Sequence, residues 1–574
     1  MKNILKKAVF ILVFVTVLIL PVFAGGGQSS SVSNSAAEQG YPAYLNTGNT
    51  YPVVKQGNNI TISILSRRQT QYGGEANDIW FWKWVEHKMN IKTTIEQVLD
   101  AARNERKALL FASGDLPDLM MELSLSTSEI IRYGTTDKQL YDVSKLLNPA
   151  LSPNLLKAME EVPDARTLLT SPDGGIYSFP LISSLINVQG GGYQRLYMNT
   201  KWLAQVGLGR PETLEDFYTI LKAFKEKDPS GTGRIIPLGG GNNASNPQHF
   251  VLSALGFVNK SSSLTGPALR SGKVEIPAGS PVFRDFLVYM NRLYAEGLID
   301  PDYYTINDAQ INARLAEKRV GVWPGSAVYT QQPQYEDFSQ FEALSPVTSP
   351  QNSVKLTNNG DVIAISGDVI SAKTRYPEVC MRLMDYFYTV EGVIYHLEGP
   401  PVNKNEPTFG MFNPWFWDAE RSSAIFPDVE SGKYVSNYEN RLREISPIVN
   451  RRGYVAIATD AIRELAGQPR EENLQFDTLS GDGNMRASVY ELAVPYGIDA
   501  YPNIVYFTPQ ESTRISDLQT VINNFVSQEA ARFITGANSI NNFDRYLNEL
   551  NALGYKEYQD FYIKAYENYL AAKR

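Results

Sequence analysis

The chain contains few residues of the two types that most often hold metals or act as activated nucleophiles. It has one cysteine, Cys380, and three histidines, His87, His249 and His396, among 574 residues. A single cysteine cannot form an intrachain disulfide, and it excludes a thiolate cluster around zinc. Cys380 lies in the apolar segment Val379–Met384, so we expect a small buried side chain. No HExxH or GxSxG motif occurs, which excludes the common metalloprotease and serine hydrolase patterns.

Positive charge is also in short supply. The chain has 53 Lys and Arg against 61 Asp and Glu, a net charge of -8. Residues 1–24 carry three lysines and no acid, so the chain without them has a net charge of -11. We therefore expect no nucleic-acid partner and no anionic lipid surface as a partner. Aromatic residues are plentiful, with 33 Tyr, 25 Phe and 7 Trp, and these serve both cores and sugar-stacking surfaces.

The N-terminal segment is typical of a secretory signal peptide. Three lysines precede the apolar run Ala8–Phe23, and Val22 and Ala24 are small residues at the positions that signal peptidase reads. The run is shorter than the ~20 residues that span a bilayer, so we expect cleavage after Ala24 and not a membrane anchor. Gly25–Gly27 follow where a lipoprotein needs cysteine. We expect a soluble periplasmic or otherwise extracytoplasmic protein without a lipid anchor.

Strand and helix patterns alternate near the start of the mature chain. Alternating apolar residues predict a strand over Asn59–Leu65, a helix follows over Asn77–Met89, and Ile91–Ile95 is a second strand. Asp100–Ser113 predicts a helix that ends at Gly114. This alternation indicates α/β layers with a mainly parallel sheet. About 550 mature residues exceed what one core normally holds, so we expect at least two lobes.

Three further segments predict amphipathic helices that face a core. Thr213–Lys225 carries an apolar stripe, and Thr213 with Asp216 forms a capping pair. A second stripe over Phe283–Leu293 precedes Gly297, and a third over Leu518–Ile534 precedes Gly536.

Several short segments resemble, in their order and spacing, the family 1 extracellular solute-binding proteins of carbohydrate ABC importers. The segments are Leu110–Met120, Asp173–Pro180, Leu196–Leu203, Gly207–Phe217, Leu293–Pro301, Gly321–Trp323, Arg532–Gly536 and Phe543–Tyr546. Each is weak by itself, but their order and spacing over roughly residues 58–570 make a specific signal. The resemblance is to the long branch that is associated with oligosaccharide and alginate uptake.

The resemblance implies a two-lobe α/β fold of the type II-like periplasmic-binding-protein class, with a ligand cleft between the lobes and a helical C-terminus. Family members cross between lobes after the segment Tyr177–Pro180 and return near Asp361–Ile365. The expected boundaries are signal peptide 1–24, flexible Gly/Ser-rich linker 25–57, lobe 1 first part 58–182, lobe 2 first part 183–358, lobe 1 second part with insertions 359–507, and C-terminal helices of lobe 2 508–574.

The resemblance implies a binding protein that captures a carbohydrate, most naturally an oligosaccharide, and delivers it to the transmembrane permease subunits of an ABC transporter. We expect a monomer with no cofactor and no catalytic activity. The alternative is a secreted carbohydrate-active enzyme, either a glycoside hydrolase or a lyase, because paired carboxylates are possible among 61 acids. No acid pair stands in a recognisable catalytic setting, which favours the binding protein.

The first candidate ligand contacts lie where predicted strands end. Trp323 follows the strand Arg319–Val322 and precedes a predicted turn at Pro324–Ser326, and relatives place a stacking Trp in this segment. An ordinary core Trp is the alternative. Glu122 ends a buried strand where relatives contact ligand, and a structural ion pair is equally expected. Arg67 leaves the first strand and could bind hydroxyls or a uronate carboxylate, or lie in a solvated loop.

Amide and aromatic side chains supply the remaining candidates. Asn242 and Gln248 follow the glycines Gly239–Gly241 after a predicted strand. The loop lacks the Lys-Ser/Thr ending of a phosphate-binding loop, so its amides suit neutral hydroxyls. Trp415 lies in the aromatic cluster 413–417, where a stacking wall and a core wedge are both open interpretations.

The turn Asp228–Arg234 resembles a calcium loop that relatives carry, of the type Asp-Pro-Asn-Gly-Asn-Gly-Lys followed by Asp-Glu. Here Ile235 and Ile236 stand in place of the two acids. Calcium takes ~6–8 oxygen ligands, and one carboxylate with two hydroxyls supplies few of them. We therefore expect a turn without metal.

Overall fold

The structure is a computed structural model of the whole chain. It describes residues 40–68, 75–162, 164–182, 195–242, 245–260, 262–325, 339–359, 361–399, 416–418, 423–425, 488–489 and 491–573. The chain divides into two compact units, Met1–Ala43 and Tyr44–Arg574, and all helices and strands named below belong to the second. Within the described ranges, none of the helices combines the length and apolarity that crossing a bilayer requires.

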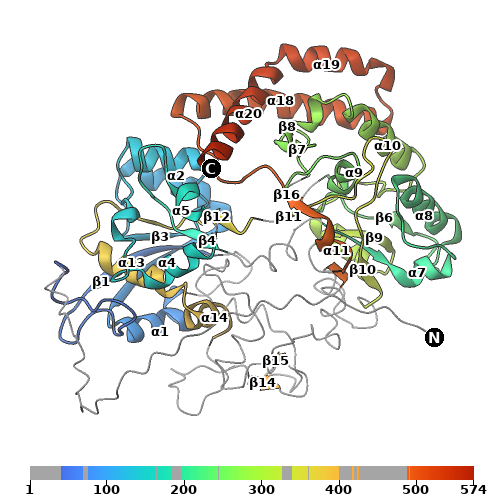
Figure 1. Cartoon of the computed structure of the whole chain (residues 1–574). Helices are drawn as coiled ribbons and strands as arrows, with labels where there is room; N and C mark the ends of the chain where they lie inside the picture. Colours follow the sequence, from blue (N-terminus) through green and yellow to red (C-terminus); the bar gives the residue numbers. More distant parts are fainter. Residues whose placement is uncertain are drawn as a thin grey trace, which may run out of the picture. The chain divides into compact units, whose positions relative to one another are not determined.

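The first sheet is mainly parallel, as the sequence predicts. Its strand order is β13-β3-β1-β2, where β1 pairs in parallel with both β2 and β3, and β13 runs antiparallel to β3 (Figure 1). The strands are β1 (Thr61–Arg68), β2 (Lys92–Leu99), β3 (Leu119–Met121) and β13 (Val369–Ile370). The alternation in β1 buries Ile62 and Ile64. We call this sheet and its helices lobe 1.

Helices pack around the sheet of lobe 1 (Figure 1). They are α1 (Trp80–Met89), α2 (Arg103–Ser113), α3 (Thr127–Ile130), α4 (Pro153–Glu160), α5 (Ala165–Leu169), α13 (Pro377–Tyr386) and α14 (Val390–Glu398). Helix α2 ends at Gly114, which has φ 67°, so the predicted stop is confirmed. The thiol of Cys380 in α13 is fully buried, and burial raises its pKa, which keeps it protonated and unreactive.

The motif Ser113–Asp118, which lies in the resemblance segment Leu110–Met120, links strands of lobe 1 through hydrogen bonds of its last residue. Asp118, just before β3, accepts hydrogen bonds from the backbone N–H of Ser63 (2.8 Å) and from its hydroxyl (2.6 Å). The hydroxyl of Thr374 donates to the other carboxylate oxygen at 2.6 Å. The aspartate therefore joins three chain segments, which gives the motif a structural role.

Two pairs of strands join segments that are far apart in the sequence. β4 (Pro180–Ile182) runs antiparallel to β12 (Ile363–Ile365), and β11 (Thr357–Asn359) runs parallel to β16 (Gly497–Asp499). The β4 and β12 strands are the segments where the resemblance implies crossing and return between lobes. These two segments are thus hydrogen-bonded to each other.

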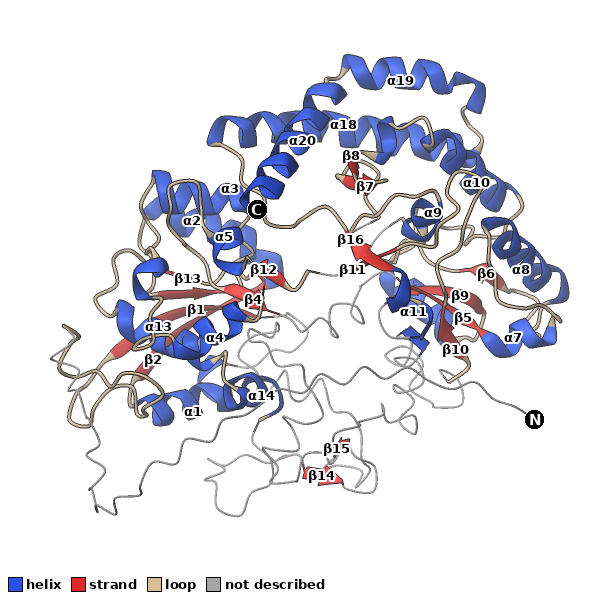
Figure 2. Ribbon diagram, viewed as in Figure 1, coloured by secondary structure: helices blue, strands red, loops and turns tan. Residues whose placement is uncertain are grey.

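The second sheet has the strand order β10-β5-β9-β6 (Figure 2). Its strands are β5 (Arg195–Asn199), β6 (Ile236–Leu238), β9 (Val320–Gly325) and β10 (Phe341–Ala343). β6 pairs with β9 in parallel, and β5 is antiparallel to both β9 and β10. The associated helices are α7 (Thr200–Gln205), α8 (Leu214–Lys227), α9 (Gln248–Ala254), α10 (Phe283–Ala295) and α11 (Asp308–Ala316). We call this sheet and its helices lobe 2.

The predicted capping pair at the start of α8 is confirmed. Asp216 N–H donates to the Thr213 hydroxyl at 3.1 Å, and Thr213 N–H donates to the Asp216 carboxylate at 3.0 Å. These bonds lower the pKa of Asp216, the hydroxyl contact making the largest contribution.

Three C-terminal helices complete the hydrophobic core of lobe 2. α18 (Pro509–Thr535), α19 (Phe543–Ala552) and α20 (Tyr555–Ala572) lie beside one another (Figure 1). Phe533 and Tyr546 share one buried cluster with Phe283 and Met290 of α10. A hairpin of β7 (Ala268–Arg270) and β8 (Lys273–Glu275) contacts α20, and a second hairpin is formed by β14 (Phe416–Asp418) and β15 (Ser423–Ile425).

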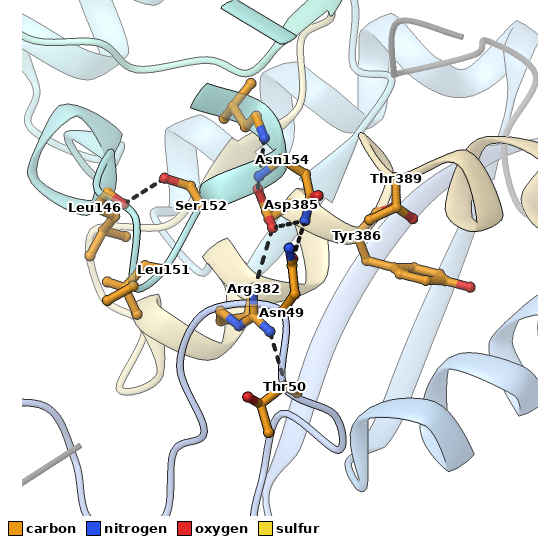
Figure 3. A network of polar contacts seen from close by, with 12 residues as sticks. Asn49, Thr50, Leu146, Leu151, Ser152, Asn154, Arg382, Asp385, Tyr386 and Thr389 are labelled. Carbon is orange, nitrogen blue, oxygen red and sulfur yellow. Dashed lines mark hydrogen bonds and ion pairs between the residues drawn. The ribbon is translucent and has the colours of Figure 1, made fainter. Parts of the chain in front are cut away.

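The segment 44–57, which the sequence places in a flexible linker, is packed against lobe 1. Leu45, Val53 and Val54 are fully buried, and Leu45 forms an antiparallel bridge with Val54. Arg382 donates to the Thr50 carbonyl at 3.2 Å and also contacts Asp385 (Figure 3). The few apolar residues among Gly, Asn and Tyr are spaced irregularly, which explains why the pattern did not reveal this packing.

Ser488, Val489 and Tyr501 contact elements of lobe 2, although the expected boundary groups them with lobe 1. The Ser488 hydroxyl accepts a hydrogen bond from Ala343 N–H at 2.9 Å. Val489 packs with Trp323, and Tyr501 packs with Leu269 of β7. The lobe boundaries as a whole stay predictions.

Candidate functional site

The loop that leaves β6 is shaped by a glycine that no other residue could replace without strain. Gly240 has φ 110°, and a Cβ there would collide with the Ser245 carbonyl oxygen and with Pro324. The chain then turns to Asn242, whose N–H donates to the Tyr303 carbonyl at 2.7 Å. This geometry brings the predicted ligand residue Asn242 back towards the start of α9.

Asn246 holds this loop in place. Its Oδ1 accepts from the Tyr303 hydroxyl at 2.8 Å and from Gln248 N–H at 3.0 Å. Its Nδ2 donates to Asn242 Oδ1 at 3.2 Å. Because Asn246 is buried and bonds both residues, it holds the two predicted ligand residues Asn242 and Gln248 near each other.

A pocket of about 400 Å³ opens next to these two residues. The lining comes from parts of the chain that are distant in sequence, namely the loop after β6 with the start of α9, the segment 262–265, Tyr304 and α18. The lining residues are Asn242, Asn246, Gln248, Ser262, Ser263, Leu264, Thr265, Tyr304, Asn523, Val526, Ser527, Ala530 and Ala531. We call this the lobe-2 pocket.

The lobe-2 pocket combines amides and hydroxyls with one aromatic ring, and none of its lining residues is charged. Gln248 is 4% exposed, and its side-chain amide has no hydrogen-bond partner among the residues that the structure describes. A buried amide of this kind stabilises the protein most when a ligand completes its hydrogen bonds. Burial raises the pKa of Tyr304, so its hydroxyl stays protonated and can donate a hydrogen bond. The ring of the same side chain offers a flat apolar face.

The histidine next to the pocket loop is also neutral at physiological pH. His249 Nδ1 lies 3.1 Å from the Asn246 carbonyl oxygen. Burial lowers the pKa of His249 to about 4, which outweighs the effect of that contact. The pocket and its immediate support therefore carry little charge near pH 7.

The two charged residues of lobe 1 that the sequence predicts as ligand contacts, Arg67 and Glu122, lie beside each other. Arg67 at the end of β1 donates to Asp100 through Nε and, at 3.1 Å, through Nη2. Its Nη1 lies 3.8 Å from Glu122 Oε2, and Glu122 is buried directly after β3. The bond to Asp100 and the charge of Glu122 raise the pKa of Arg67. The structural ion pair that the sequence allowed for Glu122 is thus present.

Trp323 lies in a hydrophobic cluster of lobe 2. It is 3% exposed and stacks on Tyr197 with ring centroids 6.1 Å apart. Its indole N–H has no hydrogen-bond partner among the described residues. The predicted turn at Pro324 is wrong, because β9 continues to Gly325 and pairs with β5. The Trp323 ring covers Gly325, where any Cβ would collide with it. Trp415 lies outside the described residues.

The turn Asp228–Arg234 does not fit a calcium ion. The Asp228 carboxylate accepts from the Ser230 hydroxyl and, at 2.6 Å, from Gly233 N–H. The Thr232 hydroxyl lies 2.8 Å from that of Ser230. The carboxylate and the two hydroxyls of the turn are therefore engaged with one another, and they are fewer than the ~6–8 oxygens that calcium takes. Among the described residues, no group of three or more His, Cys, Asp or Glu side chains could hold a metal.

Comparison with known proteins identifies relatives over most of the chain. The model of a family described as bacterial extracellular solute-binding protein matches residues 70–394. The fructooligosaccharide ABC transporter substrate-binding protein FusA of Streptococcus pneumoniae serotype 4 (strain ATCC BAA-334 / TIGR4) is 24% identical over 487 residues, which are 82% of this chain and 83% of FusA. The polygalacturonan/rhamnogalacturonan-binding protein YtcQ of Bacillus subtilis (strain 168) is 21% identical over 43% of this chain and 46% of YtcQ.

Solved structures share the fold. An extracellular solute-binding protein from Bifidobacterium longum subsp. infantis superposes with a TM-score of 0.72 at 20% identity, covering 90% of this chain and 99% of that protein. The predicted two-lobe α/β fold with a helical C-terminus is therefore confirmed.

Proposed function

Because this chain belongs to the bacterial extracellular solute-binding protein family, we propose that it captures an oligosaccharide and delivers it to the permease subunits of an ABC importer. The family is extracellular, so the chain works outside the cytoplasm. FusA and YtcQ, which cover different shares of this chain, both carry carbohydrate ligands in their names. The proposal extends that ligand class to this protein.

The lobe-2 pocket is the observation that carries the proposal. A sugar presents hydroxyls around its rim and an apolar C–H face. The side-chain amides of Gln248 and Asn242 supply donors and acceptors for hydroxyls, and Tyr304 supplies a flat apolar surface. Trp323, Glu122, Arg67 and Trp415 stay predicted ligand residues, and support for them is weaker because the first three already have partners or packing within the fold.

Capture is proposed to follow the open and closed states of a two-lobe protein. A ligand favours the closed state only through contacts that are missing in the open one. A sugar held in the lobe-2 pocket and touched by lobe 1 after closure meets that requirement. The permease subunits would then distinguish loaded from empty protein by the closed geometry.

We also propose that the protein acts as a monomer without catalysis, exported through cleavage after Ala24 and without a lipid anchor. The alternative of a carbohydrate-active enzyme predicts turnover. Incubating purified protein with oligosaccharides and measuring reducing ends and lyase double bonds separates the two.

N-terminal sequencing and mass measurement of protein from the natural cell test the cleavage site and the absence of lipid.

A blocking variant of the pocket tests the main proposal. Ser527 is exposed on α18 and lines the pocket, whereas its neighbour Gln528 is exposed on the same helix and is not a lining residue. Ser527→Trp places an indole in the pocket without disturbing the core, and Gln528→Trp is the matched control. Calorimetric titration with an oligosaccharide panel should show binding by the wild type and the control but not by Ser527→Trp. Equal affinity of all three proteins would remove the pocket from the proposal.

A further inference from the structure

We infer that the lobe-2 pocket selects neutral sugars and rejects uronates, an inference that rests on the proposed function. The pocket is lined by amides, hydroxyls, one phenol and small apolar groups, with no cation among them. A carboxylate that enters such a pocket loses water without gaining a charged partner, which is strongly unfavourable. A neutral hydroxyl in the same place exchanges water for an amide at little cost.

The lysine closest in sequence to the pocket segment 262–265 already forms an ion pair within the fold. Lys260 donates to the Asp361 carboxylate, and its Nζ lies 3.1 Å from Asn503 Oδ1. Asn503 in turn donates to the other oxygen of Asp361. Burial lowers the pKa of Lys260 and raises that of Asp361, and the attraction between them opposes both shifts. Its charge is therefore balanced within the fold and is not aimed at a ligand.

Arg67, which the sequence suggested as a partner for a uronate carboxylate, is likewise paired with acidic side chains of the protein. Arg67 bonds Asp100 through two nitrogens and faces Glu122 with the third. A uronate beside Arg67 would add one more carboxylate to a group that already has two. Arg195, whose charge helps to lower the pKa of His249, is not a lining residue of the pocket.

The pocket residues can instead bind a sugar through neutral groups alone. The Thr265 hydroxyl donates to Asn523 Oδ1, which leaves the Asn523 Nδ2 as a donor on the α18 wall. The amide of Gln248 provides both a donor and an acceptor. Donors and acceptors therefore occur on both sides of the pocket, which suits hydroxyls that act in both roles.

The test compares sugars of equal length that differ in charge. Wild-type protein is titrated with neutral fructo- and malto-oligosaccharides and with oligogalacturonides. The ionic strength is held at about 0.15 M, where the Debye length is about 8 Å. We expect affinity for the best neutral sugar to exceed that for any uronate by about 100-fold or more. Ser527→Lys adds a cation to the pocket wall and should narrow this gap by roughly tenfold, whereas Gln528→Lys should leave it unchanged.

Each outcome decides a different point. Uronate binding that equals or exceeds neutral binding overturns the charge selectivity while the proposed capture of oligosaccharides stands. If Ser527→Lys leaves the ratio of neutral-sugar affinity to uronate affinity unchanged, the lobe-2 pocket is not the source of the charge selectivity. That result overturns the inference. Binding of neither sugar class overturns the inference together with the proposed function.

Discussion

Arg382 Nη1 lies 3.5 Å from Asp385 Oδ2, one turn along α13, and neither side chain has any exposed surface (Figure 3). Asp385 also accepts from the backbone N–H groups of Asn154 (2.9 Å) and Leu155 (2.8 Å) at the start of α4. Arg382 reaches the Thr50 carbonyl in the N-terminal segment. One buried ion pair thus connects the segment before β1, α4 and α13.

Removing one member of this pair should destabilise lobe 1 strongly. Asp385→Ala leaves a buried guanidinium and two helix N–H groups without their acceptor, so we expect a loss of about 3–5 kcal/mol in the free energy of unfolding. Urea denaturation measures it. The control is Asp560→Ala, which breaks the exposed Lys556–Asp560 pair and should cost less than about 1 kcal/mol. Similar small losses in both variants would contradict the prediction.

Trp323→Ala separates a core role from a ligand role. Because Trp323 is buried against Tyr197, we expect the variant to lose roughly 3–5 kcal/mol of unfolding free energy in the absence of ligand. Trp323→Phe should lose less, since it keeps an aromatic contact. A Trp323→Ala protein of unchanged stability that binds sugar ten- to hundred-fold more weakly would instead support the stacking role.

The pKa of His249 predicts a dependence of stability on pH. Burial lowers this pKa to about 4 from the ordinary 6.5, so the unfolded chain takes up a proton in an interval where the folded protein does not. The contribution is fully present above pH 6.5 and is lost as the pH falls towards 4. We expect the urea midpoint to decrease between pH 7.5 and 5, and the decrease to be smaller in His249→Gln. An equal decrease in both proteins would show that other groups are responsible.

Calcium chelation tests the interpretation of the Asp228 turn. Because Asp228 is engaged by Ser230 and Gly233, we expect EDTA to leave the melting temperature unchanged. The measurement is a thermal unfolding scan with and without added calcium. A melting temperature that falls on chelation and recovers with calcium would mean that the turn opens to bind the ion.

Local sequence patterns predicted the elements whose ends depend on nearby residues. Gly114 ends α2, and Thr213 with Asp216 begins α8, because each cap is built from residues within one helical turn. The strand alternation of β1 was visible for the same reason. The turn expected at Pro324 failed because pairing with β5, a tertiary contact, extends β9 through that residue.

Features built from distant segments could not be read in this way. The loop after β6 suggested Asn242 and Gln248, but Tyr304, Thr265 and Asn523 reach the same pocket only through the fold. No periodicity links these positions. The packing of segment 44–57 likewise depends on Arg382, which lies more than 300 residues further along the chain.

The order in which these pieces appear along the chain has a consequence for biogenesis. The sheet of lobe 1 is incomplete until β13 has been made, and the core of lobe 2 lacks one side until α18, α19 and α20 follow. Contacts between such distant segments form slowly, because long loops must close first. A nascent chain that has not reached its last helices thus lacks the partners of many apolar side chains. We therefore expect the polypeptide to stay unfolded until its synthesis is nearly finished, which would keep it in the form that the proposed export requires.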